Sequence, residues 1–112
     1  MSVVTNLILT TCSGGLDSDA LSQVNEFFDG QRGLVSCDDS SLERGWYGGC
    51  KMLECDMAIG AFNHINLNSL LVHLKDKVRW REDYDFELLQ LIVKEQDDDR
   101  FRIINVAEHV PT

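Results

Sequence analysis

The chain has 112 residues, the length of one ordinary domain, so we expect a single domain over residues 1–112. Hydrophobic residues make up 44% and charged residues 26%, close to the globular average, which excludes a disordered or fibrous chain. Nineteen acidic residues against ten basic ones give a net charge of −9. This balance argues against direct binding to nucleic acid or to an anionic membrane, because both need a basic face.

The sequence shows no targeting signal. Residues 1–11 lack a positively charged start and include several threonines, so they do not predict a secretory signal peptide. No stretch approaches the roughly 18 apolar residues that a membrane-spanning helix needs, so we expect a cytoplasmic protein without membrane contact. Disulfides are rare in that reducing compartment. The cysteines that we therefore expect as free thiols are Cys12, Cys37, Cys50 and Cys55.

The first half of the chain predicts two strands around one helix. Residues 3–11 are rich in β-branched side chains and predict a strand. Apolar residues at helical spacing then predict a helix over residues 18–29, capped by Asp17 or Ser18 and ended by Gly30. A short apolar run predicts a second strand at residues 34–37.

The second half predicts a strand, a helix and a hairpin. Apolar and polar residues alternate over residues 53–61, which is typical of a half-buried strand. A leucine stripe predicts a helix over residues 66–78 with Asn66 as its N-cap. A charged connector follows at residues 79–85. Residues 86–95 and 101–106 then predict two strands joined by a short acidic turn.

The expected order is therefore β-α-β-β-α-β-β. Its first six elements predict an α+β fold of the ferredoxin-like type, with helices packed on one face of a mainly antiparallel sheet. The seventh element, an extra C-terminal strand, is expected to extend the sheet beside the fourth strand.

A six-residue motif, SGGLDS, lies between the first strand and the first helix. It resembles the SGGxDS pyrophosphate-binding loop of the PP-loop ATPases. That resemblance implies that Ser13, Gly14, Gly15 and Ser18 contact the pyrophosphate of ATP and that Asp17 orients the loop or a metal ion. The same residue types also build a glycine turn followed by a helix cap. Residues 1–31 contain no lysine or arginine, so we expect no countercharge for a triphosphate nearby.

Neither a metal site nor a catalytic centre is indicated. Cys50 and Cys55 are spaced more widely than a CxxC pair, and the three histidines show no ligand spacing. No nucleophile elbow of the GxSxG type occurs, although a nucleophile and a histidine that meet only in space stay open. We expect no metal and no cofactor, and a binding protein rather than an enzyme.

Aromatic and acidic residues gather in two expected loops. Tryptophan and tyrosine dominate binding hot spots because they bury a large area at low entropic cost. The alternative is that Trp46 and Trp80 fold back onto the end of the sheet. The residues that we predict to bind a partner are Trp46 and Tyr47 with Asp38 and Asp39, and Trp80 and Tyr84 with Asp83 and Asp85.

These features favour a small acidic protein-interaction module that occludes a larger, basic protein partner. Immunity proteins and phage-encoded inhibitors of host defence share this size, charge and lack of catalytic motifs. The alternative function is ATP binding through the SGGLDS loop. A third hypothesis is a structural subunit that forms a homodimer through a sheet edge, and the strand at residues 34–37 is the candidate edge.

Overall fold

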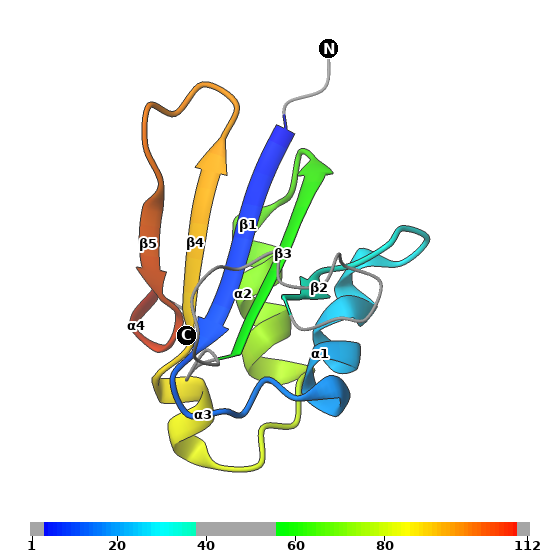
Figure 1. Ribbon diagram of the computed structural model, residues 1–112, viewed down its shortest axis with the longest axis vertical. Helices are drawn as coiled ribbons and strands as arrows, with labels where there is room; N and C mark the ends of the chain where they lie inside the picture. Colours follow the sequence, from blue (N-terminus) through cyan, green and yellow to red (C-terminus); the bar gives the residue numbers. More distant parts are fainter. Residues whose placement is uncertain (1–3, 38–55, 110–112) are drawn as a thin grey trace, which may run out of the picture.

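The computed structural model describes residues 4–37 and 56–109 of the chain. These residues form an α+β fold with one five-stranded antiparallel sheet and short helices (Figure 1). The strands are β1 (Val4–Thr11), β2 (Val35–Ser36), β3 (Asp56–Asn63), β4 (Gln90–Glu95) and β5 (Arg102–Asn105). The helices are α1 (Ser18–Asn25), the 3₁₀ turn η1 (Glu26–Phe28), α2 (Leu67–Asp76), α3 (Asp83–Glu87) and α4 (Val106–His109).

The strand order is β2-β3-β1-β4-β5, with β1 in the centre. Ile8 of β1 lies opposite Ile59 of β3 on one side and opposite Ile92 of β4 on the other. β2 pairs with the outer edge of β3, and β5 pairs with the outer edge of β4. The prediction that the last strand extends the sheet beside the strand before it is therefore confirmed.

The hydrophobic core lies on one face of the sheet. In β1, Thr5, Leu7 and Leu9 are buried, whereas Asn6 and Ile8 between them are only half-buried. This alternation is the period of two that sequence analysis uses to predict a strand. α2 runs behind the sheet in Figure 1 and shares the core with α1. The buried helix residues are Ala20 and Val24 of α1 and Leu70, Leu71 and Leu74 of α2.

Both predicted helix caps are confirmed. The Asp17 carboxylate accepts the Ala20 N–H at 2.9 Å, and the Asn66 side-chain oxygen accepts the Ser69 N–H at 3.1 Å. Each cap satisfies a backbone donor that the first turn of a helix leaves free. The predicted helix over residues 18–29 is divided into α1 and η1, and Gly30 follows with φ of +82°, a conformation that favours glycine.

The structure corrects the expectations for residues 79–95. The end of the expected connector and the start of the expected strand form a helix, α3, and the strand begins only at Gln90, while residues 79–82 remain a connector. Asp83, Tyr84 and Asp85 therefore lie on a helix rather than in a loop. The carboxylate of Asp85 accepts the Glu82 N–H at 3.1 Å, and this contact stabilises the helix start.

Other boundaries also differ from the expectations: the helix expected at residues 66–78 spans Leu67–Asp76, and the strand expected at residues 34–37 spans Val35–Ser36. The last strand ends at Asn105 instead of residue 106, and the chain continues into α4. The Val106 N–H still donates to the Leu89 carbonyl at 3.1 Å, so the ladder extends one position beyond the strand. The strand expected at residues 53–61 is observed as Asp56–Asn63, and residues 53–55 lie outside the described part of the chain.

A matched pair of substitutions in β4 tests the one-sided core. Leu91 is fully buried, whereas its neighbour Ile92 points to the opposite face and is half-buried. We expect Leu91→Ala to lower the free energy of unfolding by about 2–5 kcal/mol, through lost burial and a cavity. Ile92→Ala is expected to lower it by about half as much or less. Urea unfolding measures both, and equal losses would contradict a core confined to one face.

Candidate functional site

The SGGLDS loop and α3 meet at the side chain of Asp85. This carboxylate is 3% exposed. Ser13 donates its hydroxyl hydrogen to Asp85 Oδ1 at 2.5 Å, while Oδ2 accepts the Glu82 N–H at 3.1 Å. A buried carboxylate is costly unless such donors surround it. Asp85 therefore ties the loop after β1 to the start of α3.

Further contacts complete this arrangement. Thr11 Oγ1 donates to the backbone carbonyl of Asp85 at 3.2 Å, and the Gly15 N–H donates to Ser13 Oγ at 3.2 Å. A Cβ atom added to Gly15 would overlap the Asp85 carboxylate, so the loop needs glycine here for the close approach. We refer to Thr11, Ser13, Gly15, Glu82 and Asp85 as the Asp85 cluster.

The Asp85 cluster contains two of the four residues that the PP-loop resemblance assigns to pyrophosphate, Ser13 and Gly15. The Ser13 hydroxyl is engaged by Asp85, and the Asp85 carboxylate lies directly against Gly15. Asp17 caps α1 and also pairs with Arg81. The turn-and-cap alternative accounts for these contacts, and Gly14 adopts the positive φ of +79° that such a turn uses. ATP binding through Ser13, Gly14, Gly15, Asp17 and Ser18 stays a prediction.

A basic group does lie beside the loop, which corrects the expectation of no nearby countercharge. Arg81 Nη2 lies 2.8 Å from Asp17 Oδ2. The expectation considered residues 1–31 only, whereas Arg81 comes from the connector between α2 and α3. Because the Arg81 side chain is 77% exposed, this ion pair contributes little to stability.

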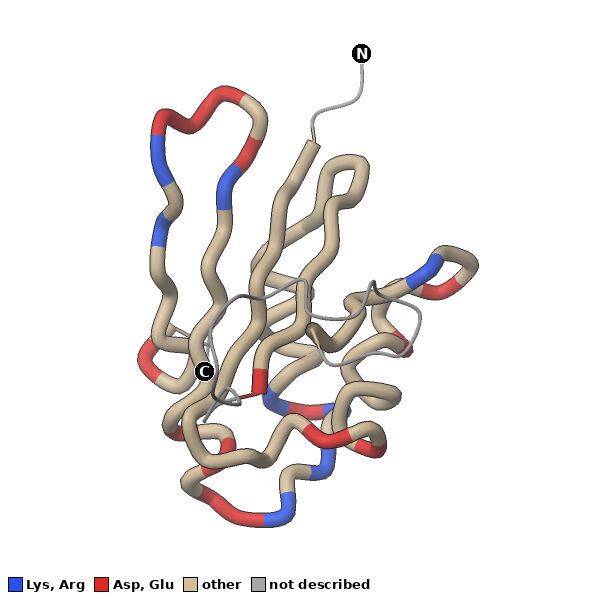
Figure 2. The backbone as a smooth tube through the Cα atoms, viewed as in Figure 1, with Lys and Arg blue, Asp and Glu red and all other residues tan. Residues whose placement is uncertain are grey.

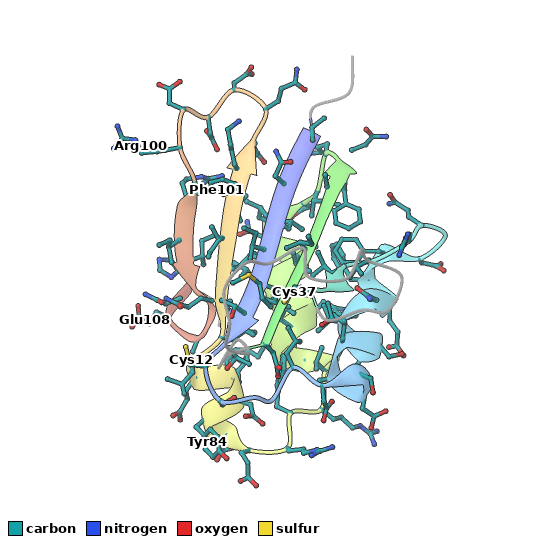
Figure 3. All side chains as sticks on the ribbon, in the orientation of Figure 1. Cys12, Cys37, Tyr84, Arg100, Phe101 and Glu108 are labelled. Atoms are coloured by element: carbon teal, nitrogen blue, oxygen red, sulfur yellow. The ribbon has the colours of Figure 1, made fainter. Side chains whose placement is uncertain are left out.

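An exposed apolar pair surrounded by acids consists of Tyr84 on α3 and Leu88 directly after it. Tyr84 is 51% exposed and Leu88 is 48% exposed. The Leu88 N–H donates to the Tyr84 carbonyl at 3.0 Å, so the two residues lie one turn apart on the same side. Tyr84 projects from the end of the molecule that carries α3 (Figure 3). The exposed residues Glu82, Asp83, Tyr84, Glu87 and Leu88 form what we call the acidic α3 surface.

Figure 2 shows where charge gathers in the described residues. Acidic residues cluster around α3 and the start of α1 at one end of the sheet, and a second group lies in the β4–β5 turn. Lysine and arginine lie beside both groups, so the negative charge is local rather than spread over one whole side. Large exposed apolar side chains lie beside both groups: Tyr84 and Leu88 in the acidic α3 surface, and Phe101 at the end of the β4–β5 turn.

The structure brings some of the predicted partner-binding residues to this surface. Asp83 and Tyr84 are exposed there, whereas Asp85 is buried in the Asp85 cluster. Trp80 is half-buried against the core, and its indole N–H donates to the Leu74 carbonyl at 2.9 Å. That is the folded-back arrangement that the sequence left open for Trp80. The remaining predicted residues, Asp38, Asp39, Trp46 and Tyr47, lie outside the described residues.

Sequence reasoning did not identify Leu88 or Arg81 as site residues. The i, i+4 spacing of Tyr84 and Leu88 becomes a signal only when this segment is recognised as a helix. Arg81 reaches the loop through tertiary structure, which spacing along the sequence does not reveal.

Cysteines and histidines form no metal centre in residues 4–37 and 56–109, where no three potential ligands gather. Cys12 is exposed and Cys37 is buried, while Cys50 and Cys55 lie outside the described residues. In the same part of the chain, no helix is long and apolar enough to cross a membrane.

Comparison of the chain with protein-family models, with curated proteins and with solved structures finds no match.

A double-mutant cycle tests the contact between Gly15 and Asp85. The φ of Gly15 is not positive, so Gly15→Ala adds a steric clash without backbone strain. We expect it to lower the free energy of unfolding by about 1–3 kcal/mol. In an Asp85→Ala background the same change should cost much less, because the methyl group then has room. Additive losses in chemical denaturation would show that the two residues do not touch.

A thermal-shift measurement tests the nucleotide alternative. Because the Asp85 carboxylate fills the position beside Gly15, we expect ATP with Mg²⁺ to leave the melting temperature where Mg²⁺ alone leaves it. A ligand at a hundred times its Kd would add about 2.7 kcal/mol of stability. A shift of that size that disappears in Ser13→Ala would contradict this expectation.

Proposed function

We propose that the chain is a protein-interaction module whose acidic α3 surface binds a larger, basic protein and occludes its functional site. The observation that carries the proposal is the exposed pair Tyr84 and Leu88, framed by the exposed carboxylates of Glu82, Asp83 and Glu87. Large apolar side chains within a charged rim are the usual composition of a binding hot spot.

The two kinds of residue contribute in different ways. Carboxylates at the rim attract a basic partner over long range and raise the association rate, while they add little affinity once the complex has formed. Tyr84 and Leu88 supply the apolar area that leaves water on binding and slows dissociation. The acids therefore favour basic partners, and the apolar pair retains them.

The Asp85 cluster supports this proposal because it makes the surface rigid. A helix as short as α3 is not stable alone, since nucleating a helix costs more than one turn returns. Hydrogen bonds from Ser13 and Thr11 attach α3 to the end of β1. Tyr84 is thus held ready for contact, which reduces the entropy lost on binding.

The class of inhibitor, the ferredoxin-like type of fold and the remaining predicted binding residues belong to the same proposal. An inhibitor of the immunity or anti-defence type, acting inside the cell, fits the size and net charge of −9. A ferredoxin-like classification of the fold is supported by the run β2-β3-β1-β4, in which all neighbours are antiparallel. Trp46, Tyr47, Asp38 and Asp39 stay predicted members of the binding surface. No observation in the described residues favours the ATP-binding alternative over this proposal.

Capture and affinity measurements test the proposal. The immobilised chain is expected to retain a basic protein from a lysate of its source cells, and to release it at high salt because screening weakens the attraction. With that purified partner, Tyr84→Ala should raise Kd by about thirtyfold while leaving the melting temperature unchanged. Charge reversal at Asp83 and Glu87 should mainly slow association at low salt.

Val72→Ala is the matched control, since Val72 is an exposed apolar residue that belongs to α2 and not to the acidic α3 surface. Its Kd should equal that of the unmodified chain. Equal affinities for Tyr84→Ala and Val72→Ala would exclude the acidic α3 surface as the binding site. Trp46 and Tyr47 would then be the next residues to test.

A further inference from the structure

β5 forms an edge of the sheet, and within residues 4–37 and 56–109 it pairs only with β4. Two of the large exposed apolar side chains lie along this edge, Ile103 at 63% and Phe101 at 47% exposed. Proteins usually shorten, cover or charge an edge strand, because its unpaired backbone groups bind other strands. An apolar edge of this kind is therefore suited to pairing with a further strand.

The hydrogen-bond phase of β5 shows which backbone groups are available. The Val106 N–H donates to the Leu89 carbonyl, and these two residues continue the β4–β5 register by one position. In an antiparallel ladder, residues alternate between pointing their N–H and C=O toward the partner and away from it. The backbone N–H and C=O groups of Ile104 and Arg102 thus point toward β4. Ile103 and Asn105, and by continuation Phe101, point their backbone groups away from the sheet.

The side chain of Ile103 also ends an apolar row across the face opposite the core. In the strand registers each member lies opposite the next, so all of these side chains lie on the same face. The row consists of Val35 of β2, Ile59 of β3, Ile8 of β1, Ile92 of β4 and Ile103 of β5. Val35 and Ile103 end this row at the two edges of the described sheet, and Ile103 is the most exposed member.

We propose that β5 pairs antiparallel with β5 of a second copy of this chain, about a two-fold axis at Ile103. In this register Ile103 lies opposite its own counterpart, and Phe101 lies opposite Asn105 of the second copy. All the outward-pointing backbone groups then find partners, and the two sheets become one. A register centred on Ile104 would place Phe101 opposite Ala107, which belongs to α4, so fewer hydrogen bonds would form.

Charge complementarity favours a second copy as the occupant. Arg100 and Glu108 both project from the β5 side of the molecule, at opposite ends of the strand (Figure 3). Among the described residues neither forms an ion pair, whereas Arg102 already pairs with Asp98 at 3.5 Å. In this register Arg100 of each copy lies opposite Val106 of the other, at the start of α4, two positions before Glu108, so these opposite charges lie on the same stretch of the interface. Their attraction opposes the repulsion between two chains of net charge −9.

This edge differs from the one that sequence reasoning indicated. The expected homodimer contact was the strand at residues 34–37, which the structure places at the opposite edge as β2. β2 has two residues, so it offers a much shorter ladder than β5 and the residue before it. The dimer through β5 is independent of the partner proposed for the acidic α3 surface.

Sedimentation velocity over a wide range of protein concentrations tests the dimer. We expect the unmodified chain to shift from monomer to dimer as its concentration rises. Ile103→Pro removes an N–H that points away from β4, so it should spare the fold and weaken dimerisation by at least about tenfold. Ile103→Val keeps the N–H and the β-branched shape and should dimerise normally. Circular dichroism checks that both variants are folded.

A charge-swap series tests the proposed β5–β5 register. It also tests the dimer itself if Ile103→Pro fails to fold. Arg100→Glu and Glu108→Arg should each weaken the dimer several-fold by placing like charges together, and the double variant should restore it. A monomer at every concentration overturns the proposal. So does a dimer that withstands Ile103→Pro in folded form, or charge swaps whose combination gives no rescue.

Discussion

The carboxylate of Asp85 is the constraint on which the functional end of the molecule depends. Removing a charged group from water is unfavourable unless hydrogen-bond donors replace the lost hydration. Ser13 and the Glu82 N–H are those donors. The requirement explains the path of the loop after β1, the need for glycine at position 15, and a helix of only five residues at Asp83–Glu87.

The two proposed binding surfaces are linked through adjacent helices. α3 carries the acidic surface and contacts α4, which follows directly after the edge strand β5. In the proposed dimer the β5 strands run in opposite directions, so the two acidic α3 surfaces lie at opposite ends of the assembly. A dimer would thus present two separate sites rather than one enlarged site. Each site could hold its own basic partner without crowding by the other.

Residue patterns predicted the elements whose signal is local. The strand β1 was predicted from its β-branched residues and the caps at Asp17 and Asn66 from their residue types, because each signal depends on neighbours a few positions away. α3 could not be predicted in this way, since Asp85 stabilises it through Ser13, 72 positions earlier in the chain. For the same reason Asp85 was predicted as a surface acid, whereas tertiary structure buries it. Tyr84, predicted as a partner-binding residue in a loop, is exposed on α3, and its neighbour Leu88 was not predicted.

The central position of β1 has a consequence for how the chain folds during synthesis. Asn6 donates its side-chain N–H to the Lys94 carbonyl, 88 positions later, and Thr5 lies opposite Glu95. Until β4 leaves the ribosome, β1 can have a strand on one side only, and its buried leucines stay incompletely covered. Contacts so distant in sequence slow folding, because a long loop must close before they form. The nascent chain therefore exposes an aggregation-prone strand through most of its translation.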